Sequence, residues 1–217
     1  MIYLERKNEM NQLSTTDTKQ RLLETAMDLI LAESYGAVSV DAICEKAKVK
    51  KGSFYYFFPS KADLVVAAFE NHWETKSRPE LDRIFSAQIS PLKRLSDFFE
   101  YAYNLQKRTS ERVGKACGCP YSSVGMEQGT LDQKLRQCME HFLELHRKYL
   151  ESAIRDAVRV KEIPDCDVEQ KTDEIFAYYL GVMMLSKIAN SLEPVMLKKV
   201  KPALFQLLEI HTSKLEE

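Results

Sequence analysis

The chain has 217 residues and a formal net charge of −1, with 45% hydrophobic and 29% charged residues. This balance is typical of a globular protein with a substantial core, and the near-zero charge excludes a general nucleic-acid coat protein, which is normally strongly basic. Seven Gly and seven Pro are few for this length, which favours long helices. Neither a membrane-spanning run nor a signal-peptide pattern is present, so we expect a cytoplasmic protein without a membrane partner.

The first part of the chain predicts a polar arm followed by a helix. Residues 1–14 carry no helical stripe, so we predict a flexible arm there. A helix is then expected to begin at Thr15 or Thr16 and to stop near Gly36. Its buried face consists of apolar residues at three- and four-residue spacing, namely Leu22, Leu23, Ala26, Leu29 and Ile30.

Two short helices with a tight turn are predicted next. Ser39 is suited to cap the first, over residues 40–47, and the second covers about residues 51–57. Phe54 and Phe58 are four residues apart and are expected to point inward. This arrangement is typical of a helix-turn-helix, in which the second helix enters the major groove of DNA.

The outer surface of the second short helix has the composition of a DNA-binding surface. Five lysines lie between positions 46 and 61, where no acidic residue occurs, and they can neutralise phosphates although the whole chain is nearly neutral. Gly52 permits close approach of the helix to the DNA. The Ser53 hydroxyl can bond to base edges or phosphates, and the hydroxyls of Tyr55 and Tyr56 can bond to phosphates. The alternative is an ordinary solvated face. The predicted DNA-binding residues are Ser39, Lys50, Lys51, Gly52, Ser53, Tyr55, Tyr56 and Lys61.

The stretch VSVDAICEKAKVKKGSFYYFFPSKADL resembles the DNA-binding domain of the TetR (tetracycline repressor) family of bacterial transcriptional regulators. The resemblance covers roughly residues 15–65 and depends on motifs in a fixed order, from the Gly36 turn through residues 51–58 to Ser60-Lys61-x-x-Leu64. Two positions depart from the family pattern: Lys50 replaces a small capping residue, and Phe57 a frequent histidine.

This resemblance implies an all-α fold of about nine helices in two domains. A three-helix DNA-binding domain is expected over residues 15–60, and a ligand-binding and dimerisation domain over residues 61–217. It also implies a homodimer through the last two helices, about residues 168–215, whose apolar residues exceed what one core needs. The alternative is a monomer with a buried terminal hairpin.

The second domain is predicted to contain long amphipathic helices with unusually aromatic faces. The expected helices run from Ser60 to a break near Pro79, then over 92–112, 131–160, 168–191 and 194–215. Their aromatic residues could surround a small-molecule effector or form plain core. The candidate ligand-binding residues are Trp73, Phe98, Phe99, Tyr103, Cys119, Tyr121, Phe142, Tyr179 and Met183.

The segment 113–129 holds four of the seven glycines and predicts a loop leading into a short helix. Cys119 lies near the start of that helix with Lys115 nearby, so one interpretation gives it a lowered thiol pKa and a sensing role, shared with Cys117. In the other interpretation both cysteines simply pack. Neither their spacing nor that of His141 and His146 suits a metal site, so no metal or cofactor is predicted.

Three functions follow from these patterns. The leading hypothesis is a repressor that binds a near-palindromic DNA operator as a homodimer and is released by a small-molecule effector. The second makes oxidation or alkylation of Cys119 or Cys117 the trigger. The third is a helical enzyme with Cys119 as nucleophile and His141 or His146 as base, which leaves residues 39–61 unexplained.

Overall fold

The computed structural model describes residues 2–210, with side chains described from Thr16 onward. Every regular element in this range is helical, which confirms the all-α prediction. The elements are α1 (Ile2–Ala32), α2 (Val40–Ala47), α3 (Lys51–Phe57), α4 (Lys61–His72), a π-helical segment (Trp73–Ser77), α5 (Arg78–Ile84), α6 (Pro91–Val113), α7 (Pro120–Gln128), α8 (Gln133–Arg159), α9 (Val168–Ala189), a 3-10 turn (Glu193–Val195) and α10 (Leu197–Leu207). None of the described helices is both long and apolar enough to cross a membrane.

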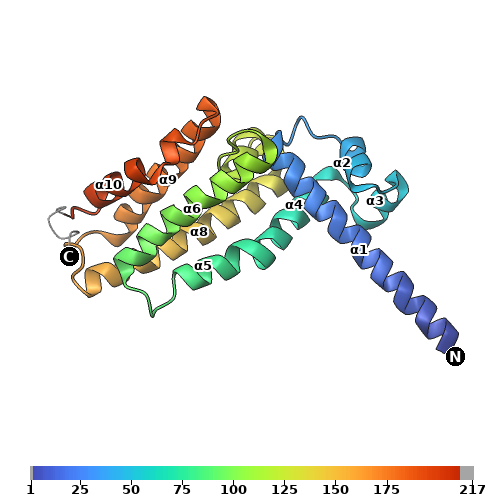
Figure 1. Cartoon of the computed structure of the whole chain (residues 1–217), viewed down its shortest axis with the longest axis horizontal. Helices are drawn as coiled ribbons and strands as arrows, with labels where there is room; N and C mark the ends of the chain where they lie inside the picture. Colours follow the sequence, from blue (N-terminus) through green and yellow to red (C-terminus); the bar gives the residue numbers. More distant parts are fainter. Residues whose placement is uncertain (1, 211–217) are drawn as a thin grey trace.

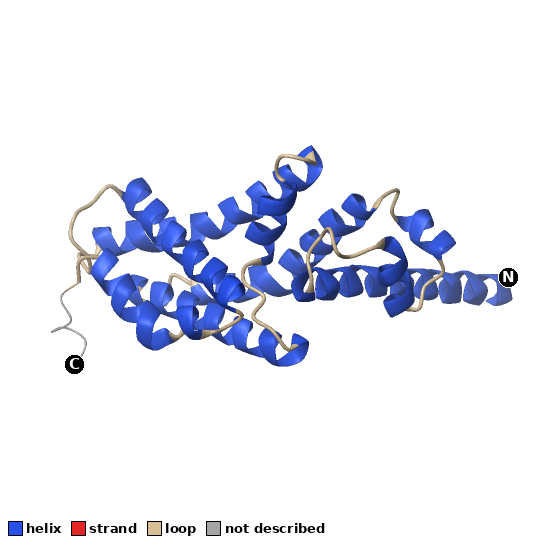
Figure 2. Ribbon diagram, turned by 90° about the horizontal axis from the view of Figure 1, so that it is seen from above, coloured by secondary structure: helices blue, strands red, loops and turns tan. Residues whose placement is uncertain are grey.

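The molecule is elongated, with a small helical head at one end and a larger helical body at the other (Figure 1). We call α2, α3 and the parts of α1 and α4 that pack on them the head, and the remaining helices the body. In the body, α8 packs against α6, α7 and α9, and α10 packs against α6 and α9. Figure 2 shows the same separation from a second direction.

Head and body have separate hydrophobic cores. The head core is centred on Phe54, which is fully buried and packs against Phe58, so the predicted inward direction of both rings is confirmed. Helix α4 contributes to both cores, because Leu64 lies in the head core while Phe69 lies in the body core. Helix α1 does the same, with Leu22 in the head core and Met27 in the body core, so the head is attached to the body largely through these two shared helices.

Helix α1 is longer than the sequence predicted. It begins at Ile2, so the expected start at Thr15 or Thr16 is wrong. Residues 2–15 contain neither Gly nor Pro and are rich in Glu, Lys, Gln, Met and Leu, which favour helix even without an apolar stripe. This part of α1 projects beyond α2 and α3 (Figure 1), and the flexibility of residues 1–14 stays a prediction.

The break or kink predicted near Pro79 takes the form of a π-helical segment, through which the backbone stays helical. The backbone N–H of Arg78 bonds to the carbonyl of Trp73, five residues back, and Pro79 has no N–H to donate. Helices α4 and α5 thus form one interrupted rod.

The remaining body helices agree with the prediction to within a few residues, except the last. Helix α10 starts at Leu197 rather than Pro194, because Met196 is extended and interrupts the helix. It ends at Leu207, and Glu209 has a left-handed φ of 56°, so the predicted continuation through Ile210 is wrong. The rest of the predicted helix, residues 211–215, lies outside the described residues.

Candidate nucleic-acid interface

The local sequence fixes the α2–turn–α3 geometry. The Ser39 hydroxyl accepts a hydrogen bond from the Ala42 N–H at 3.0 Å and caps α2 as predicted. Lys48 takes a left-handed φ of 55°, which turns the chain so that the N–H of Val49 bonds to the carbonyl of Cys44 at 2.9 Å. The turn holds α3 across α2 with few residues, as a helix-turn-helix requires.

Helix α3 presents an open outer surface. Tyr55 and Tyr56 are 51% and 77% exposed, high values for large aromatic side chains. No atom of a neighbouring residue lies within 4 Å of the position that a Cβ on Gly52 would occupy. We call Lys50, Lys51, Gly52, Ser53, Tyr55 and Tyr56 the α3 surface; all are exposed except Ser53, which is half-buried. The structure thus brings six of the eight predicted DNA-binding residues onto one short segment.

Two predicted DNA-binding lysines have partners within the head. Lys51 Nζ lies 2.7 Å from Asp41 Oδ1, and this pairing raises the pKa of the lysine. The pair is exposed, so exchanging the carboxylate for a phosphate costs little. Lys61 is different: its Nζ donates to the carbonyls of Tyr35 at 2.8 Å and Val38 at 2.9 Å. Lys61 therefore braces the α1–α2 loop rather than extending from the α3 surface.

The start of α3 lacks a side-chain cap, as the departure at Lys50 implied. Lys50 occupies the N-cap position in an extended conformation, and its side chain makes no capping hydrogen bond. We expect Lys50→Ser to stabilise the head by about 0.5–1 kcal/mol, because a serine hydroxyl can accept from the free N–H groups. Urea unfolding measures this change. Lys50→Ala removes the same charge without adding a cap, and equal stability of the two variants would contradict the capping account.

A carboxylate of the body holds the loop between α1 and α2. Glu127, near the end of α7, accepts hydrogen bonds from the N–H groups of Tyr35 at 3.1 Å and Gly36 at 2.6 Å. A Cβ at position 36 would lie 2.5 Å from a Glu127 oxygen, so the close approach requires glycine. The sequence pattern indicates only a helix stop and a turn at Gly36, and it gives no sign of this contact.

Two ion pairs also join body and head. Lys134, at the start of α8, pairs with Asp63 in α4, and Arg112, at the end of α6, pairs with Asp28 in α1. Together with Glu127, they connect three body helices to the head. A displacement of α6, α7 or α8 would therefore act on the head directly.

We expect Glu127→Gln to loosen the α1–α2 loop. The amide keeps an acceptor but loses the negative charge, and a hydrogen bond to a charged group contributes about 1.5–3 kcal/mol. Exchange of the Gly36 amide hydrogen should therefore become roughly tenfold faster or more. Glu140→Gln, at an exposed position of α8, is the control. Unchanged exchange at Gly36 would show that Glu127 does not hold the loop.

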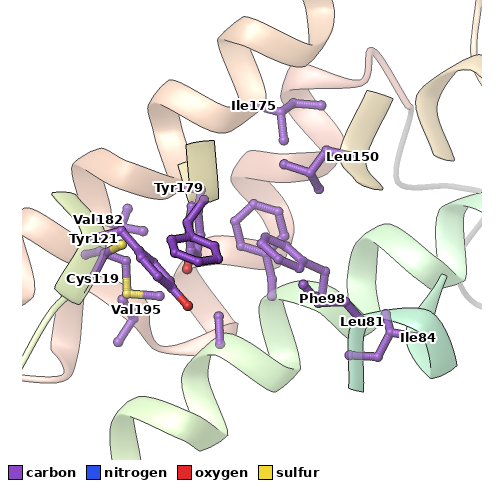
Figure 3. Close-up of a cluster of buried hydrophobic side chains, with 14 of the residues drawn as sticks. Leu81, Ile84, Phe98, Cys119, Tyr121, Leu150, Ile175, Tyr179, Val182 and Val195 are labelled. Atoms are coloured by element: carbon purple, nitrogen blue, oxygen red, sulfur yellow. The ribbon is translucent and has the colours of Figure 1, made fainter. Parts of the chain in front are cut away.

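The structure buries the candidate ligand-binding residues in the body core. Phe98 and Tyr179 have ring centroids 5.0 Å apart, and Tyr121 and Phe142 have centroids 5.4 Å apart. Figure 3 shows Phe98, Tyr121 and Tyr179 in the same cluster with Cys119. Tyr103 is half-buried at the edge, whereas the other eight candidates are buried. Trp73 and Phe142 also border a cleft of about 920 Å³ between α4–α5 and α8.

Of the two interpretations of the cysteines, the structure contradicts the lowered thiol pKa and agrees with packing, while a sensing role stays a prediction. Cys117 and Cys119 are both buried, and burial raises the pKa of each thiol. Lys187 and hydrogen bonds from Ser122 and Tyr121 oppose this effect at Cys119 without reversing it. The sequence could not reveal this result, because the burial depends on how α7 packs.

The histidines of the enzyme hypothesis are not arranged to activate a thiol. His146 is buried and its Nδ1 donates to the carbonyl of Phe142 at 2.7 Å, while burial lowers its pKa to about 4. His141 is exposed on α8. A protonated, buried Cys119 is a poor nucleophile, which weighs against a cysteine-dependent enzyme.

A capped helix, a tight turn and an open lysine- and tyrosine-bearing helix, carried by a helical body, define a helix-turn-helix DNA-binding protein. Comparison with protein families agrees: the model for bacterial regulatory proteins of the tetR family matches residues 22–68. The model for the tetracyclin repressor-like C-terminal domain matches residues 91–197. The chain belongs to the TetR family of bacterial transcriptional regulators, which confirms the resemblance seen in the sequence.

Individual relatives match across both domains. The transcriptional repressor NemR of Escherichia coli is 24% identical over 187 residues, which cover 86% of this chain and 92% of NemR. The transcriptional regulator AcuR of Cereibacter sphaeroides is 28% identical over 178 residues, or 81% of this chain and 79% of AcuR. Among solved structures, reduced E. coli NemR has a TM-score of 0.75 at 23% identity, covering 89% of this chain and 96% of that one. A TetR regulatory protein of Rhodobacter sphaeroides also has a TM-score of 0.75, at 26% identity, with coverage of 87% and 97%.

Proposed function

We propose that this regulator is a cytoplasmic repressor, a homodimer that occupies a near-palindromic operator and leaves it when a small molecule binds the body. The observation that supports it most is the α3 surface, an open helix face with glycine, lysines and tyrosines on a well-packed head. The relatives NemR of Escherichia coli and DhaR of Mycobacterium are described as repressors. The bacterial chromosome lies in the cytoplasm, where such a protein would act.

The α3 surface is proposed to contact the major groove and its flanking phosphates. Gly52 allows the helix backbone to approach the bases, and Lys51 and Ser53 lie on either side of it. Tyr55 and Tyr56 are exposed, so their hydroxyls can bond to phosphates. Ser39 is exposed but already caps α2, so its proposed DNA contact would be through the start of that helix.

The proposed dimer interface includes an apolar face of α9 that the described part of the chain leaves exposed. Leu185 and Ile188 are 51% and 73% exposed, and Met184 is exposed beside them. One to two turns earlier, Ala177 is exposed and the Cβ direction of Gly181 is open. These residues share one side of α9, and a contiguous exposed apolar stripe marks an interaction surface. We propose that a second copy of the chain covers this stripe, because the TetR family implies a homodimer and the stripe is exposed and apolar.

We expect Leu185→Asp to convert the dimer to a monomer. Burying a carboxylate on each side of a two-fold interface should weaken association at least about a hundredfold. Light scattering after size exclusion measures the mass. Leu131→Asp is the matched control, because Leu131 is 76% exposed on the turn before α8, away from α9. If both variants remain dimers, the interface does not include Leu185.

A mobility-shift experiment tests the function as a whole. The full chain should retard DNA from the region upstream of its own gene, and the affinity should fall steeply as salt increases, because phosphate contacts release counterions. To change the ratio of DNA-binding to non-binding conformations from 99:1 to 1:99, the ligand must bind the non-binding conformation more tightly by about 5.5 kcal/mol. Absence of specific binding to any DNA would overturn the proposal.

A further inference from the structure

A cleft of about 1160 Å³ separates the head from the body on one side of the molecule. It is lined by α1, by α4 and α5 with the π-helical segment between them, and by α6. We propose that this cleft is the effector site and that its ligand is an amphipathic organic anion, a carboxylate or sulfonate on an apolar body. The regulatory part of this inference depends on the repressor function proposed above, whereas the binding part does not.

The cleft contains polar side chains that lack partners. Asn71 and His72 on α4, and Tyr101 and Asn104 on α6, are all half-buried. None of the four side chains makes a hydrogen bond within the described part of the chain. Water can reach these half-buried groups, so four hydrogen-bonding side chains that converge on one cavity are available to a polar ligand that displaces this water. Burial lowers the pKa of His72 and raises that of Tyr101, so both groups are neutral hydrogen-bonding partners at pH 7.

The charges of the cleft indicate that this ligand is negative. Four of its five carboxylates have basic partners: Asp28 with Arg112, Glu80 with Arg83, Asp97 with Lys93, and Glu100 with Lys201. The fifth, Glu24, accepts a hydrogen bond from Gln20. By contrast, Lys76 and Arg108 line the cleft without an ion pair to any described residue. The lining itself holds five carboxylates and four basic side chains, but two of the carboxylates are paired with Lys93 and Lys201 from outside it. Among the described residues this leaves two cations without an ion partner against one such carboxylate, which favours an anion.

The apolar lining accounts for the rest of the ligand. Leu23, Met27 and Leu31 of α1 face the cleft, as do Ile84 of α5 and Leu105 of α6. The cleft between α4–α5 and α8 is less suited to a charged ligand. There Arg78 pairs with Glu74, Lys134 pairs with Asp63 and Lys148 lies 4.0 Å from Glu144, so each basic Lys or Arg side chain of its lining already has a carboxylate partner.

Occupation of the cleft would act on the head. The ion pair between Asp28 of α1 and Arg112 of α6 joins the two helices that border the cleft. An anion held by Arg108 and Lys76 would compete with Asp28 for Arg112 and would separate α1 from α6. The π-helical segment, which includes Lys76, also lies in the wall, and such segments frequently occur at functional sites. The ligand would thus alter how the head is attached to the body. In a dimer, this attachment sets the distance between the two heads.

Titration of the full chain with 1-anilinonaphthalene-8-sulfonate, a fluorescent amphipathic anion, tests the binding part. We expect one saturable site per chain, with affinity lowered about tenfold or more by Arg108→Gln or Lys76→Gln, since each removes a charge-assisted contact. Lys107→Gln is the matched control, because Lys107 is exposed on the same helix and does not line the cleft. The uncharged analogue N-phenyl-1-naphthylamine should bind at least tenfold more weakly.

Several results would overturn the inference. Absence of saturable binding, or equal affinities of the Arg108→Gln and Lys107→Gln variants, would reject the site. Equal binding of the uncharged analogue would reject the anion. If the sulfonate binds through Arg108 yet leaves operator affinity unchanged, the regulatory role is rejected. A protein that binds no DNA at all would refute the proposed repressor, while the fluorescence titration would still decide the site.

Discussion

Gly52→Glu is expected to lower operator affinity at least about a hundredfold without lowering the thermal stability of the protein. The new side chain meets no atom within 4 Å of its Cβ, and glutamate is a better helix former than glycine by roughly 0.5–1 kcal/mol. At the DNA, however, the carboxylate would occupy the space where α3 approaches the bases and would repel phosphates. A loss of about 1.4 kcal/mol or more in each half-site, within the range of a single base contact and doubled in a dimer, gives this factor.

Fluorescence anisotropy of a labelled operator fragment measures this effect, with the melting temperature recorded on the same preparations. Ala87→Glu is the control, because Ala87 is exposed between α5 and α6 and gives the same change in net charge. If both variants bind DNA equally well, α3 is not the helix that enters the groove.

Phe54→Ala should unfold the head and leave the body folded. Phe54 is fully buried at the centre of the head core, and loss of such a ring costs about 3–5 kcal/mol, a large share of the stability of a small domain. The body has its own core, in which Phe54 takes no part. Because the two cores share α1 and α4, the body should lose stability only along these two helices.

Hydrogen exchange followed by mass spectrometry distinguishes the two units. Peptides covering residues 40–58 should lose protection in Phe54→Ala, while those from α8 and α9 should keep it. Tyr56→Ala is the control: Tyr56 is 77% exposed, so its loss should weaken DNA binding but alter stability by no more than about 0.5 kcal/mol. Equal loss of protection throughout the chain would mean that head and body unfold as one unit.

The features that could be predicted from the sequence are local ones. The Ser39 cap, the missing cap at Lys50 and the inward direction of Phe54 and Phe58 each depend on a few neighbouring residues. The break before Pro79 is equally local, since proline removes a backbone donor. These elements also carry most of the family resemblance, so the class of protein followed from them.

The features that could not be predicted depend on packing between distant segments. Glu127 bonds to the N–H groups of Tyr35 and Gly36, which lie 92 and 91 residues earlier, and no periodicity indicates such a contact. The sequence places Lys61 in the lysine-rich stretch, which predicts a contact with DNA. That its side chain bonds to the α1–α2 loop instead depends on how the head folds, and no local pattern indicates it. Cys119 looked reactive because its burial is decided by the body helices around it.

The central claim is that two copies of α3, presented by a dimer, contact a two-fold symmetric operator. Selection of bound sequences from a random duplex library with the full-length protein tests it most directly. The account predicts a near-palindromic consensus, bound by an even number of chains, with half-sites separated by about 34 Å or a multiple of it. The Gly52→Glu variant should enrich no sequence. An asymmetric consensus bound by one chain, or no enrichment with the wild-type protein, would contradict the account.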